Sequence, residues 1–383
     1  MELKKIILAF DSFKGSLSSE QAARRAEAAV GRIFPACEVV RTVVADGGEG
    51  TTEAILHARG GTSHTVRVHD PLMRPIEARY GTIDQGRTAV LEMAAAAGLT
   101  LLGTAERNPL QTTTYGVGEM IADALQHGCR KVLIGIGGSA TNDAGCGMLR
   151  ALGFRLLDRN GHELDGTGAS LEQLAGIDDR QALTALRDTE FIVACDVDNP
   201  LYGPQGAAHV FAPQKGADPQ TVERLDAGLR NFASVVERFT GSAFARTPGA
   251  GAAGGLGGAL LSLLHARLRP GIEMLLDAVE FDRLIDGADL ILTGEGRIDR
   301  QTLHGKVPCG ILAAARKRGV PVIALGGSVE NPRELAENGF AALFPIVPGP
   351  VSLDEAMREA NAGANLENTV EQILRTLKNV ARS

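Results

Sequence analysis

Short apolar runs alternate with helical patterns at the start of this sequence, and that alternation restricts the folds it can adopt. Residues 4–10 have the composition of a buried strand, and residues 19–33 carry small apolar residues at helical spacing after a capping serine, Ser18. A second unit follows, with a Val-rich strand at residues 38–44 and a helix at residues 51–59. Successive strand–loop–helix units predict a parallel sheet covered by helices.

The C-terminal part of the chain repeats this alternation, with strands expected at residues 289–293, 320–325 and 341–347 and a long helix at the end. Because parallel strands are short, buried and joined by helical crossovers, we expect both ends of the chain to contribute to one doubly wound sheet. This predicts an α/β fold in which one sheet is built from distant parts of the sequence.

The middle of the chain differs, because residues 62–68, 76–83 and 88–93 resemble consecutive strands before the alternation with helices resumes. We interpret this region as an inserted second α/β domain, with an active site in the cleft between the two domains. The predicted boundaries give a discontinuous domain of residues 1–66 and 286–383 and an inserted domain of residues 67–285.

Composition excludes several classes of protein. The 383 residues carry a formal net charge of −7 and no cluster of Lys and Arg, whereas nucleic-acid binders normally present a basic face, so no nucleic-acid partner is expected. The five cysteines show no Cys-x-x-Cys pair and no zinc-ligand spacing, which indicates reduced thiols. No uncharged apolar run approaches the roughly 20 residues of a membrane span, and no signal peptide is recognisable. We therefore expect a cytoplasmic protein without a membrane partner.

Glycine accounts for 47 of the 383 residues, about one in eight against a usual share of roughly 7%. Many of these glycines lie in four loops, at residues 46–50, 135–143, 248–255 and 293–299. At least three of these loops follow expected strands. Glycine permits positive φ and close approach of the backbone, so such loops can direct several N–H groups toward one anion. A tight turn would explain one such loop. Four of them, with Ser, Thr, Asn and carboxylates interleaved, predict a phosphate-binding site.

Charged residues in and beside these loops fit phosphoryl transfer. This reaction needs cations on the phosphates, carboxylates for a divalent ion and a base for the acceptor hydroxyl. The candidates follow expected strands: Lys14, Asp46, Glu49, Asp196, Asp198, Glu295, Arg297 and Asp299. In an open α/β sheet, residues just past the strand ends face the ligand crevice. Each residue alone could be a helix cap, a turn former or a solvated charge, but their repetition at strand ends favours a site.

Two segments match the dinucleotide-binding pattern in part. Gly135-x-Gly137-x-x-Ala140 follows an expected strand, but the residues after it prefer caps and turns to a helix. Gly249-x-Gly251-x-x-Gly254 has no strand before it. These matches leave open an NAD-dependent dehydrogenase of a small hydroxy acid, and the same residues could serve a non-catalytic sensor of a sugar acid or a nucleotide.

Several longer motifs resemble those of the bacterial glycerate kinases of the glycerate 2-kinase type. The motifs run in one order nearly from end to end of the chain: residues 11–18, 45–51, 92–96, 135–143, 194–201, 213–217, 248–255, 293–299 and 304–306. The resemblance implies an enzyme that phosphorylates D-glycerate with ATP, at the 2-hydroxyl, to give 2-phospho-D-glycerate and ADP. It also implies a flavodoxin-like domain from both chain ends with an inserted α/β domain. The loop residues themselves do not distinguish transfer to the 2-hydroxyl from transfer to the 3-hydroxyl.

On this interpretation the candidate residues divide by role. Asp196 is the first candidate for the catalytic base, and Lys14, Asp46 and Asp299 are further catalytic candidates. Ser12, Lys14, Glu49 and Arg297 are expected to bind glycerate, and Asp196 and Glu295 to bind Mg²⁺. The phosphates of ATP are assigned to two loops through Gly137, Gly138, Ser139, Thr141, Asn142, Gly249, Gly251 and Gly254. The sequence makes no prediction of an oligomeric state.

Overall fold

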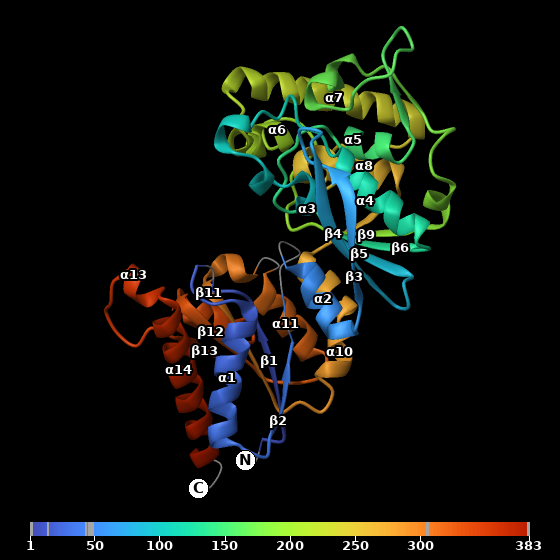
Figure 1. Ribbon diagram of the computed structural model, residues 1–383. Helices are drawn as coiled ribbons and strands as arrows, with labels where there is room; N and C mark the ends of the chain where they lie inside the picture. Colours follow the sequence, from blue (N-terminus) through green and yellow to red (C-terminus); the bar gives the residue numbers. More distant parts are fainter. Residues whose placement is uncertain (1–2, 14, 43, 45–49, 304–305, 381–383) are drawn as a thin grey trace. The chain divides into compact units, whose positions relative to one another are not determined.

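The computed structural model describes residues 3–13, 15–42, 44, 50–303 and 306–380. The chain forms two compact units, unit 1 from residues 1–46 and 275–383 and unit 2 from residues 47–274 (Figure 1). These limits differ from those expected at residues 66 and 285. The first lies earlier because α2 (Thr51–Arg59) packs against β4 (Pro75–Ile83) and β5 (Thr88–Glu92) of unit 2. The second lies earlier because α10 (Phe281–Leu284) packs against α11 (Val307–Arg316) of unit 1. The active site expected between the domains stays a prediction.

Unit 1 contains a five-stranded sheet in which every neighbouring pair is parallel. The strand order is β2-β1-β11-β12-β13, which is 2-1-3-4-5 in chain order, the flavodoxin-like doubly wound arrangement. Two strands come from the N-terminal part of the chain and three from the C-terminal part, so the prediction of one sheet built from both ends is confirmed. The elements of unit 1 are β1 (Lys5–Phe10), α1 (Ser19–Ile33), β2 (Glu38–Arg41), α10, β11 (Leu290–Ile298), α11 (Val307–Arg316), β12 (Val322–Val329), α12 (Pro332–Glu337), β13 (Ala342–Pro345), α13 (Leu353–Ala356) and α14 (Glu359–Val380).

Helices α1 and α14 lie side by side over one face of this sheet (Figure 1). Alternate residues of β1, Ile6, Leu8 and Phe10, enter the core that these helices cover, and α11 packs on the sheet as well. Helix α1 begins at the predicted residue, because the hydroxyl of Ser18 accepts the N–H of Gln21 while the Gln21 side chain accepts the N–H of Ser18. This capping box fixes the start of the helix by local sequence alone.

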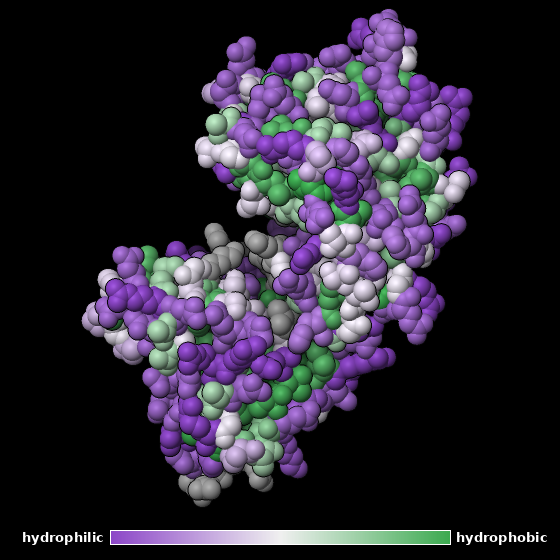
Figure 2. Space-filling model, in the orientation of Figure 1, coloured by the Kyte–Doolittle hydropathy of each residue, from purple (hydrophilic) through white to green (hydrophobic). Residues whose placement is uncertain are grey.

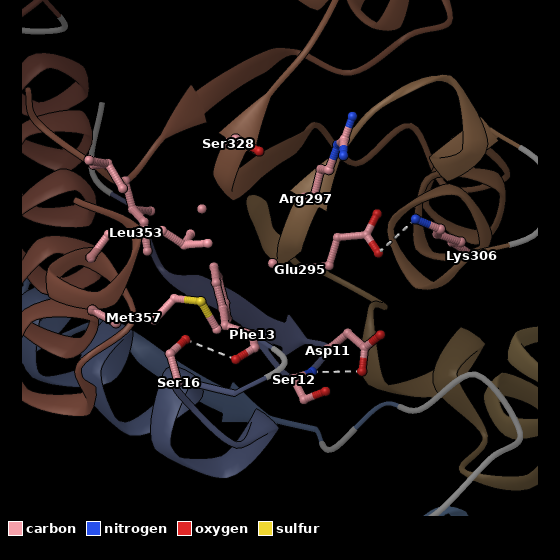
Figure 3. A pocket seen from close by; sticks show the side chains of 16 residues that line it. Asp11, Ser12, Phe13, Ser16, Glu295, Arg297, Lys306, Ser328, Leu353 and Met357 are labelled. Atoms are coloured by element: carbon pink, nitrogen blue, oxygen red, sulfur yellow. Dashed lines mark hydrogen bonds and ion pairs between the residues drawn. The ribbon is translucent and has the colours of Figure 1, made fainter. Parts of the chain in front are cut away.

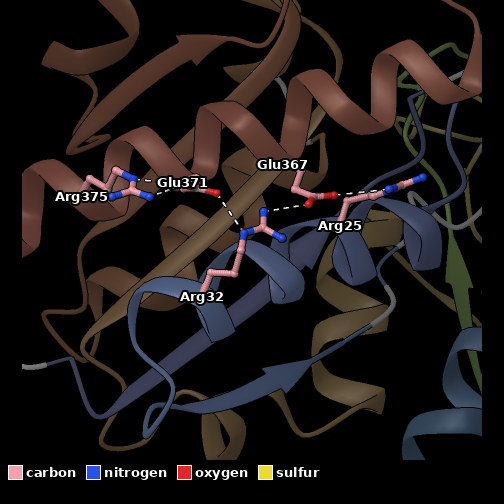
Figure 4. A network of polar contacts seen from close by, with 5 residues as sticks. All are labelled: Arg25, Arg32, Glu367, Glu371 and Arg375. Atoms are coloured by element: carbon pink, nitrogen blue, oxygen red, sulfur yellow. Dashed lines mark hydrogen bonds and ion pairs between the residues drawn. The ribbon is translucent and has the colours of Figure 1, made fainter.

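A network of exposed and half-exposed charges adds to the contact between α1 and α14 (Figure 4). The Arg32 guanidinium lies 2.7 Å from Glu367 and 2.9 Å from Glu371, and Arg25 lies 3.3 Å from Glu367. Because exposed ion pairs contribute little to stability, the buried apolar face of the two helices is the main source of their association.

Unit 2 contains a mixed six-stranded sheet with the order β10-β9-β6-β5-β4-β3. The pairs between β5, β6, β9 and β10 are parallel, whereas β3, β4 and β5 are joined in sequence as antiparallel neighbours. Helices α4, α5, α7 and α8 supply much of the core. The remaining elements are β3 (Thr62–His69), α3 (Ala94–Ala97), α4 (Tyr115–Gln126), β6 (Lys131–Gly135), α5 (Cys146–Ala151), β7 (Arg155–Leu157), β8 (Gly176–Asp178), β9 (Glu190–Ala194), α6 (Ala207–Phe211), α7 (Pro219–Thr240), α8 (Leu256–Leu263), β10 (Arg267–Arg269) and, reaching into unit 1, α9 (Gly271–Ala278).

Strand β11 is longer than its sequence pattern predicts. The strand was expected to end at residue 293 and to be followed by a glycine-rich loop, but β11 continues to Ile298, paired with β12 as far as Val329. Gly294 allows β11 and β12 to lie close together, because a Cβ at this position would lie 2.1 Å from the carbonyl oxygen of Leu325. Glu295 and Arg297 therefore lie on one face of a strand and not in a loop.

None of the helices in the described part of the chain is both long and apolar enough to cross a membrane. Hydrophilic residues cover most of the face shown in Figure 2, and hydrophobic residues appear there in separate patches. The most exposed large hydrophobic side chain among the described residues is Leu353, which is 72% exposed. This residue lines a pocket in unit 1.

Candidate functional site

Unit 1 contains a pocket of about 390 Å³ at the carboxyl ends of β1, β11 and β12. The strand order of the sheet reverses between β1 and β11, and open α/β sheets bind ligands at such a point. The pocket is lined by Asp11, Ser12, Phe13, Ser16, Glu295, Gly296, Arg297, Lys306, Gly327, Ser328, Ile346, Val347, Leu353, Ala356, Met357 and Ala362. Three residues predicted from the sequence, Ser12, Glu295 and Arg297, thus share one cavity.

Glu295 is the buried carboxylate of this pocket (Figure 3). One of its oxygens, Oε1, accepts a hydrogen bond from the Thr302 hydroxyl at 2.6 Å, and the other lies 3.6 Å from the Lys306 ammonium. Burial raises the pKa of Glu295 above its ordinary value, while the Thr302 hydroxyl and Lys306 oppose that rise. The same hydroxyl accepts the N–H of Asp299 at 3.1 Å, so Thr302 connects two of the predicted carboxylates.

Arg297 supplies an exposed cation at the pocket, with Asp11 and Ser12 on the loop after β1. The Arg297 guanidinium lies 2.7 Å from Glu330 and 3.3 Å from Asp299, which orients the side chain. The N–H of Asp11 donates to the carbonyl of Gly294 at 2.9 Å, so the loop is tied to β11. The pocket therefore presents two cations, Arg297 and Lys306, near hydroxyl and carboxylate groups that can orient a small anion.

The other side of the pocket is apolar. Figure 3 shows Phe13, Leu353 and Met357 together on the side opposite Lys306. Phe13 belongs to the loop after β1, Leu353 begins α13 and Met357 follows that helix. The pocket can thus hold a molecule with one charged part and one less polar part.

Unit 2 carries the second predicted loop, which follows β6. Gly137 and Gly138 are exposed there, whereas Ser139, Thr141 and Asn142 are buried. No role was predicted for Lys215, yet its ammonium donates to the Ser139 hydroxyl at 2.7 Å and to the Thr141 carbonyl at 2.6 Å. The only sequence signal for this residue was its place in the motif at residues 213–217.

Charged and polar groups are buried beneath this loop. Burial lowers the pKa of Lys215 to about 7, and the nearby Asp143 opposes that effect. The Asp143 carboxylate accepts the N–H and hydroxyl of Thr114, each at 2.7 Å, and the N–H groups of Gly145 and Gly147 at 3.1 and 3.2 Å. Burial nevertheless raises the pKa of Asp143. The loop is therefore held from below by a buried polar cluster.

The loop at residues 248–255 packs against the β6 loop. The carbonyl of Gly254 accepts the N–H of Ala144, in the β6 loop, at 3.0 Å. The N–H of Gly251 donates to the carbonyl of Asn199, in the segment after β9, at 2.9 Å. These contacts give Gly249, Gly251 and Gly254 a packing role in the buried part of unit 2. Their assignment to the phosphates of ATP stays a prediction.

The dinucleotide-binding alternative lacks its structural context. Residues 136–145 form no helix in this fully described stretch, and the next helix, α5, begins only at Cys146. The second match, at residues 249–254, is not preceded by a strand in the likewise described residues 241–248. A dinucleotide fingerprint requires a strand, a tight glycine turn and a helix directly after it. Neither segment provides this arrangement.

Asp196 follows β9, as predicted, and is exposed. Its Oδ1 accepts the N–H of Gly271, the first residue of α9, at 2.8 Å. The second predicted Mg²⁺ ligand, Glu295, belongs to the other unit. Within the described ranges, no group of three or more His, Cys, Asp and Glu side chains is arranged to hold a metal ion.

Three predicted residues, Lys14, Asp46 and Glu49, lie outside the described residues. Glu92, for which no role was predicted, lies far from them in sequence but contacts the residues that follow Glu49. Its carboxylate accepts the N–H of Thr52 at 2.8 Å and that of Gly50 at 3.3 Å, at the start of α2. A carboxylate in this place offsets the positive end of the helix and orders the entry to it.

A model of the glycerate kinase family matches residues 6–378. The chain belongs to the glycerate kinase family. This member of the family is 48% identical to a glycerate kinase of Bacillus subtilis strain 168, with 98% of each chain covered. It is 44% identical to a glycerate 2-kinase of Escherichia coli K12, covering 93% of this chain and 94% of that one.

A solved structure described as a glycerate kinase 2, from Salmonella typhimurium LT2, matches this family member over 100% of both chains with a TM-score of 0.89 and 42% identity. The predicted fold class and the resemblance are thereby confirmed. The protein is a phosphotransferase enzyme, so the dehydrogenase and sensor alternatives are not supported. The residues that perform the transfer stay predictions.

Proposed function

We propose that this enzyme transfers the γ-phosphoryl group of ATP to the 2-hydroxyl of D-glycerate and releases 2-phospho-D-glycerate and ADP. The observation that carries the proposal is the 44% identity, over 93% of the chain, to a relative named glycerate 2-kinase. The choice of the 2-hydroxyl over the 3-hydroxyl rests on that relative. The pocket of unit 1 supports the small organic acid as the acceptor.

The glycerate carboxylate is assigned to the cationic side of that pocket. Arg297 and Lys306 line it, and the Ser12 hydroxyl adds a donor. A carboxylate suits a guanidinium that can form two parallel hydrogen bonds, and such charge-assisted bonds are about twice as strong as neutral ones. Lys14 and Glu49 remain further candidates for contacts with glycerate.

The phosphates of ATP are assigned to the loop after β6. Gly137 and Gly138 expose their backbone there, and Gly138 has a φ of 73°, a conformation that glycine adopts without strain. Ser139, Thr141 and Asn142 continue this loop into the interior. An exposed glycine turn over a buried cation favours a polyanion.

Mg²⁺ fits this enzyme as a companion of the nucleotide and not as an ion held by the protein alone. Among the described residues no metal cluster exists, and both oxygens of Glu295 already have partners in Thr302 and Lys306. Mg²⁺ commonly keeps several waters and binds substrate phosphates with one or two carboxylates. Asp196 would be that carboxylate if it does not act as the base, and the bound ion would neutralise charge on the transferred phosphoryl group.

The reaction needs a base for the acceptor hydroxyl, and Asp196 is the residue assigned to it. The hydroxyl oxygen of glycerate forms a bond to the γ-phosphorus while the bond from that phosphorus to the bridging oxygen of ADP breaks. The hydroxyl proton passes to a carboxylate oxygen of Asp196. Asp299, and Asp46 outside the described residues, are the alternative bases.

A coupled assay of ADP release tests the proposal. With Mg-ATP alone ADP should form slowly, and D-glycerate should accelerate its release with saturation. Propionate, which has the carboxylate but no hydroxyl, should not. Absence of any glycerate-dependent ADP release would overturn the proposal.

A further inference from the structure

Lys215 is a buried cation that the proposed reaction does not yet use. The residue is 1% exposed and follows α6 in a short turn at Pro213–Lys215. Its ammonium reaches Ser139 Oγ at 2.7 Å and the Thr141 carbonyl at 2.6 Å, which are both part of the loop after β6. A lysine is rarely buried to this extent without a carboxylate partner at hydrogen-bond distance, so its position requires an explanation.

The loop above Lys215 combines exposed and buried parts. Gly137 and Gly138 are exposed, while the residues that follow are buried. Three atoms of that buried part find no hydrogen-bond partner among the described residues: Thr141 Oγ1, Asn142 Oδ1 and Asn142 Nδ2. Buried polar groups nearly always have partners, and exceptions mark places where a protein uses them for function.

The unpaired polar atoms of Thr141 and Asn142 and the Lys215 ammonium all lie at the loop after β6. The Lys215 hydrogen bonds fix Ser139 and Thr141, which directly follow the exposed glycines. The ammonium also places a positive charge below a glycine turn, where little water screens it. An apolar side chain of the same length would fill the space but would supply neither effect.

We infer that Lys215 is the positioning residue of nucleotide binding, holding the loop after β6 in the conformation that accepts the phosphates of ATP and supplying positive charge beneath it. This inference rests on the proposed function, because it takes that loop as the phosphate site. Lys215 acts through Ser139 and Thr141 and does not touch the reacting atoms. We therefore expect that replacing Lys215 changes the affinity for the nucleotide and leaves the affinity for glycerate unchanged.

Replacement of Lys215 by Met tests the inference. K215M should raise the KM for ATP by roughly tenfold or more, the loss expected for a charge-assisted hydrogen bond, and leave the KM for D-glycerate unchanged. Tyr80→Phe is the matched control, because it removes a partly buried hydrogen bond from Tyr80 to Asp123, at 2.7 Å, in the same unit. Y80F should leave both KM values unchanged.

A second variant covers the case in which K215M does not fold. Ser139→Ala removes the hydroxyl that accepts from the ammonium and adds no bulk, and it should raise the KM for ATP severalfold. An unchanged KM for ATP in either folded variant, or a rise in the KM for glycerate alone, would overturn the inference.

Direct binding of ATP, measured by calorimetry, separates this inference from the proposed function. Native enzyme that binds ATP at least tenfold more tightly than K215M supports the role of Lys215 even if no glycerate is phosphorylated. Conversely, glycerate-dependent ADP release by the native enzyme together with equal ATP affinities would leave the proposed function standing and refute the role of Lys215.

Discussion

The carboxylate of Asp196 accepts a hydrogen bond from the backbone N–H of Gly271, with 2.8 Å between the two atoms. Gly271 begins α9, so this carboxylate lies where the free N–H groups of a helix concentrate positive charge. The bond fixes the orientation of Asp196 at the end of β9. This hydrogen bond is compatible with a helix-capping role and with a catalytic role for Asp196. The two roles can be separated by substitution.

Asp196→Asn should lower kcat about 10²–10⁴-fold, the usual contribution of a general base, with little change in the thermal unfolding midpoint. Asparagine caps helices as well as aspartate does, so the contact with Gly271 survives. Turnover and thermal unfolding are measured on the same preparation, with Asp196→Ala as the variant that loses both roles. A kcat for D196N within about tenfold of the native value would assign Asp196 to capping alone.

Arg297→Met should raise the KM for D-glycerate by roughly tenfold or more, because the acid would lose a charge-assisted hydrogen bond. The KM for ATP should not change. Arg333→Met is the control, since Arg333 is an exposed arginine of the same unit that pairs with Glu337 on α12. Equal glycerate KM values in the native enzyme and R297M would remove Arg297 from the acceptor site.

The affinity for ATP should fall as the pH rises through about 7, because burial lowers the pKa of Lys215 to about 7. Below that pH the ammonium is charged; above it the unliganded enzyme loses the proton. A bound polyphosphate favours the charged form, so binding takes up a proton and weakens with increasing pH. K215M should lack this component. The KM for ATP, measured for both proteins from about pH 6 to pH 9, gives a difference in which the titration of ATP itself cancels. Parallel profiles would contradict the assignment.

Local patterns in the sequence were sufficient for much of the fold. The helix at Ser19–Ile33 follows from Ser18 and Gln21 and from the spacing of its alanines, and all of these are neighbours in the chain. The single sheet from both chain ends followed from the handedness and burial of strand–helix crossovers, which constrain topology without tertiary detail.

The missed features depend on contacts between distant residues. Gly294 and Gly296 were predicted to lie in a loop, but Gly294 allows β11 to approach β12, which no local pattern records. No role was predicted for Lys215. Lysines are usually exposed, and the burial of this one becomes evident only when α6 and the β6 loop are placed together. The candidate site was therefore predicted as a set of residue types, without the contacts that orient them.

Gly254→Ala should destabilise unit 2 more than Gly241→Ala. Both glycines have positive φ, 67° and 72°, so both substitutions introduce a similar backbone strain of about 1 kcal/mol. At Gly254 a Cβ would also lie 2.1 Å from the carbonyl oxygen of Thr141, whereas among the described residues, apart from its chain neighbours, none has an atom within 4 Å of a Cβ at Gly241. Chemical unfolding measures the difference. Because the collision displaces the β6 loop, G254A should also raise the KM for ATP. Equal free energies of unfolding for the two variants would show that the loops can move to accommodate the added Cβ without loss of stability.

Phosphorus NMR of the product formed from D-glycerate and Mg-ATP shows which hydroxyl receives the phosphoryl group. A phosphate on the 2-oxygen is attached to a carbon with one hydrogen, so the proposed product gives a signal split into a doublet by that proton. A phosphate on the 3-oxygen is attached to a methylene carbon and gives a triplet. The proposed function predicts the doublet of 2-phospho-D-glycerate together with the signals of ADP. A triplet, or the absence of any phosphate ester of glycerate, would contradict it.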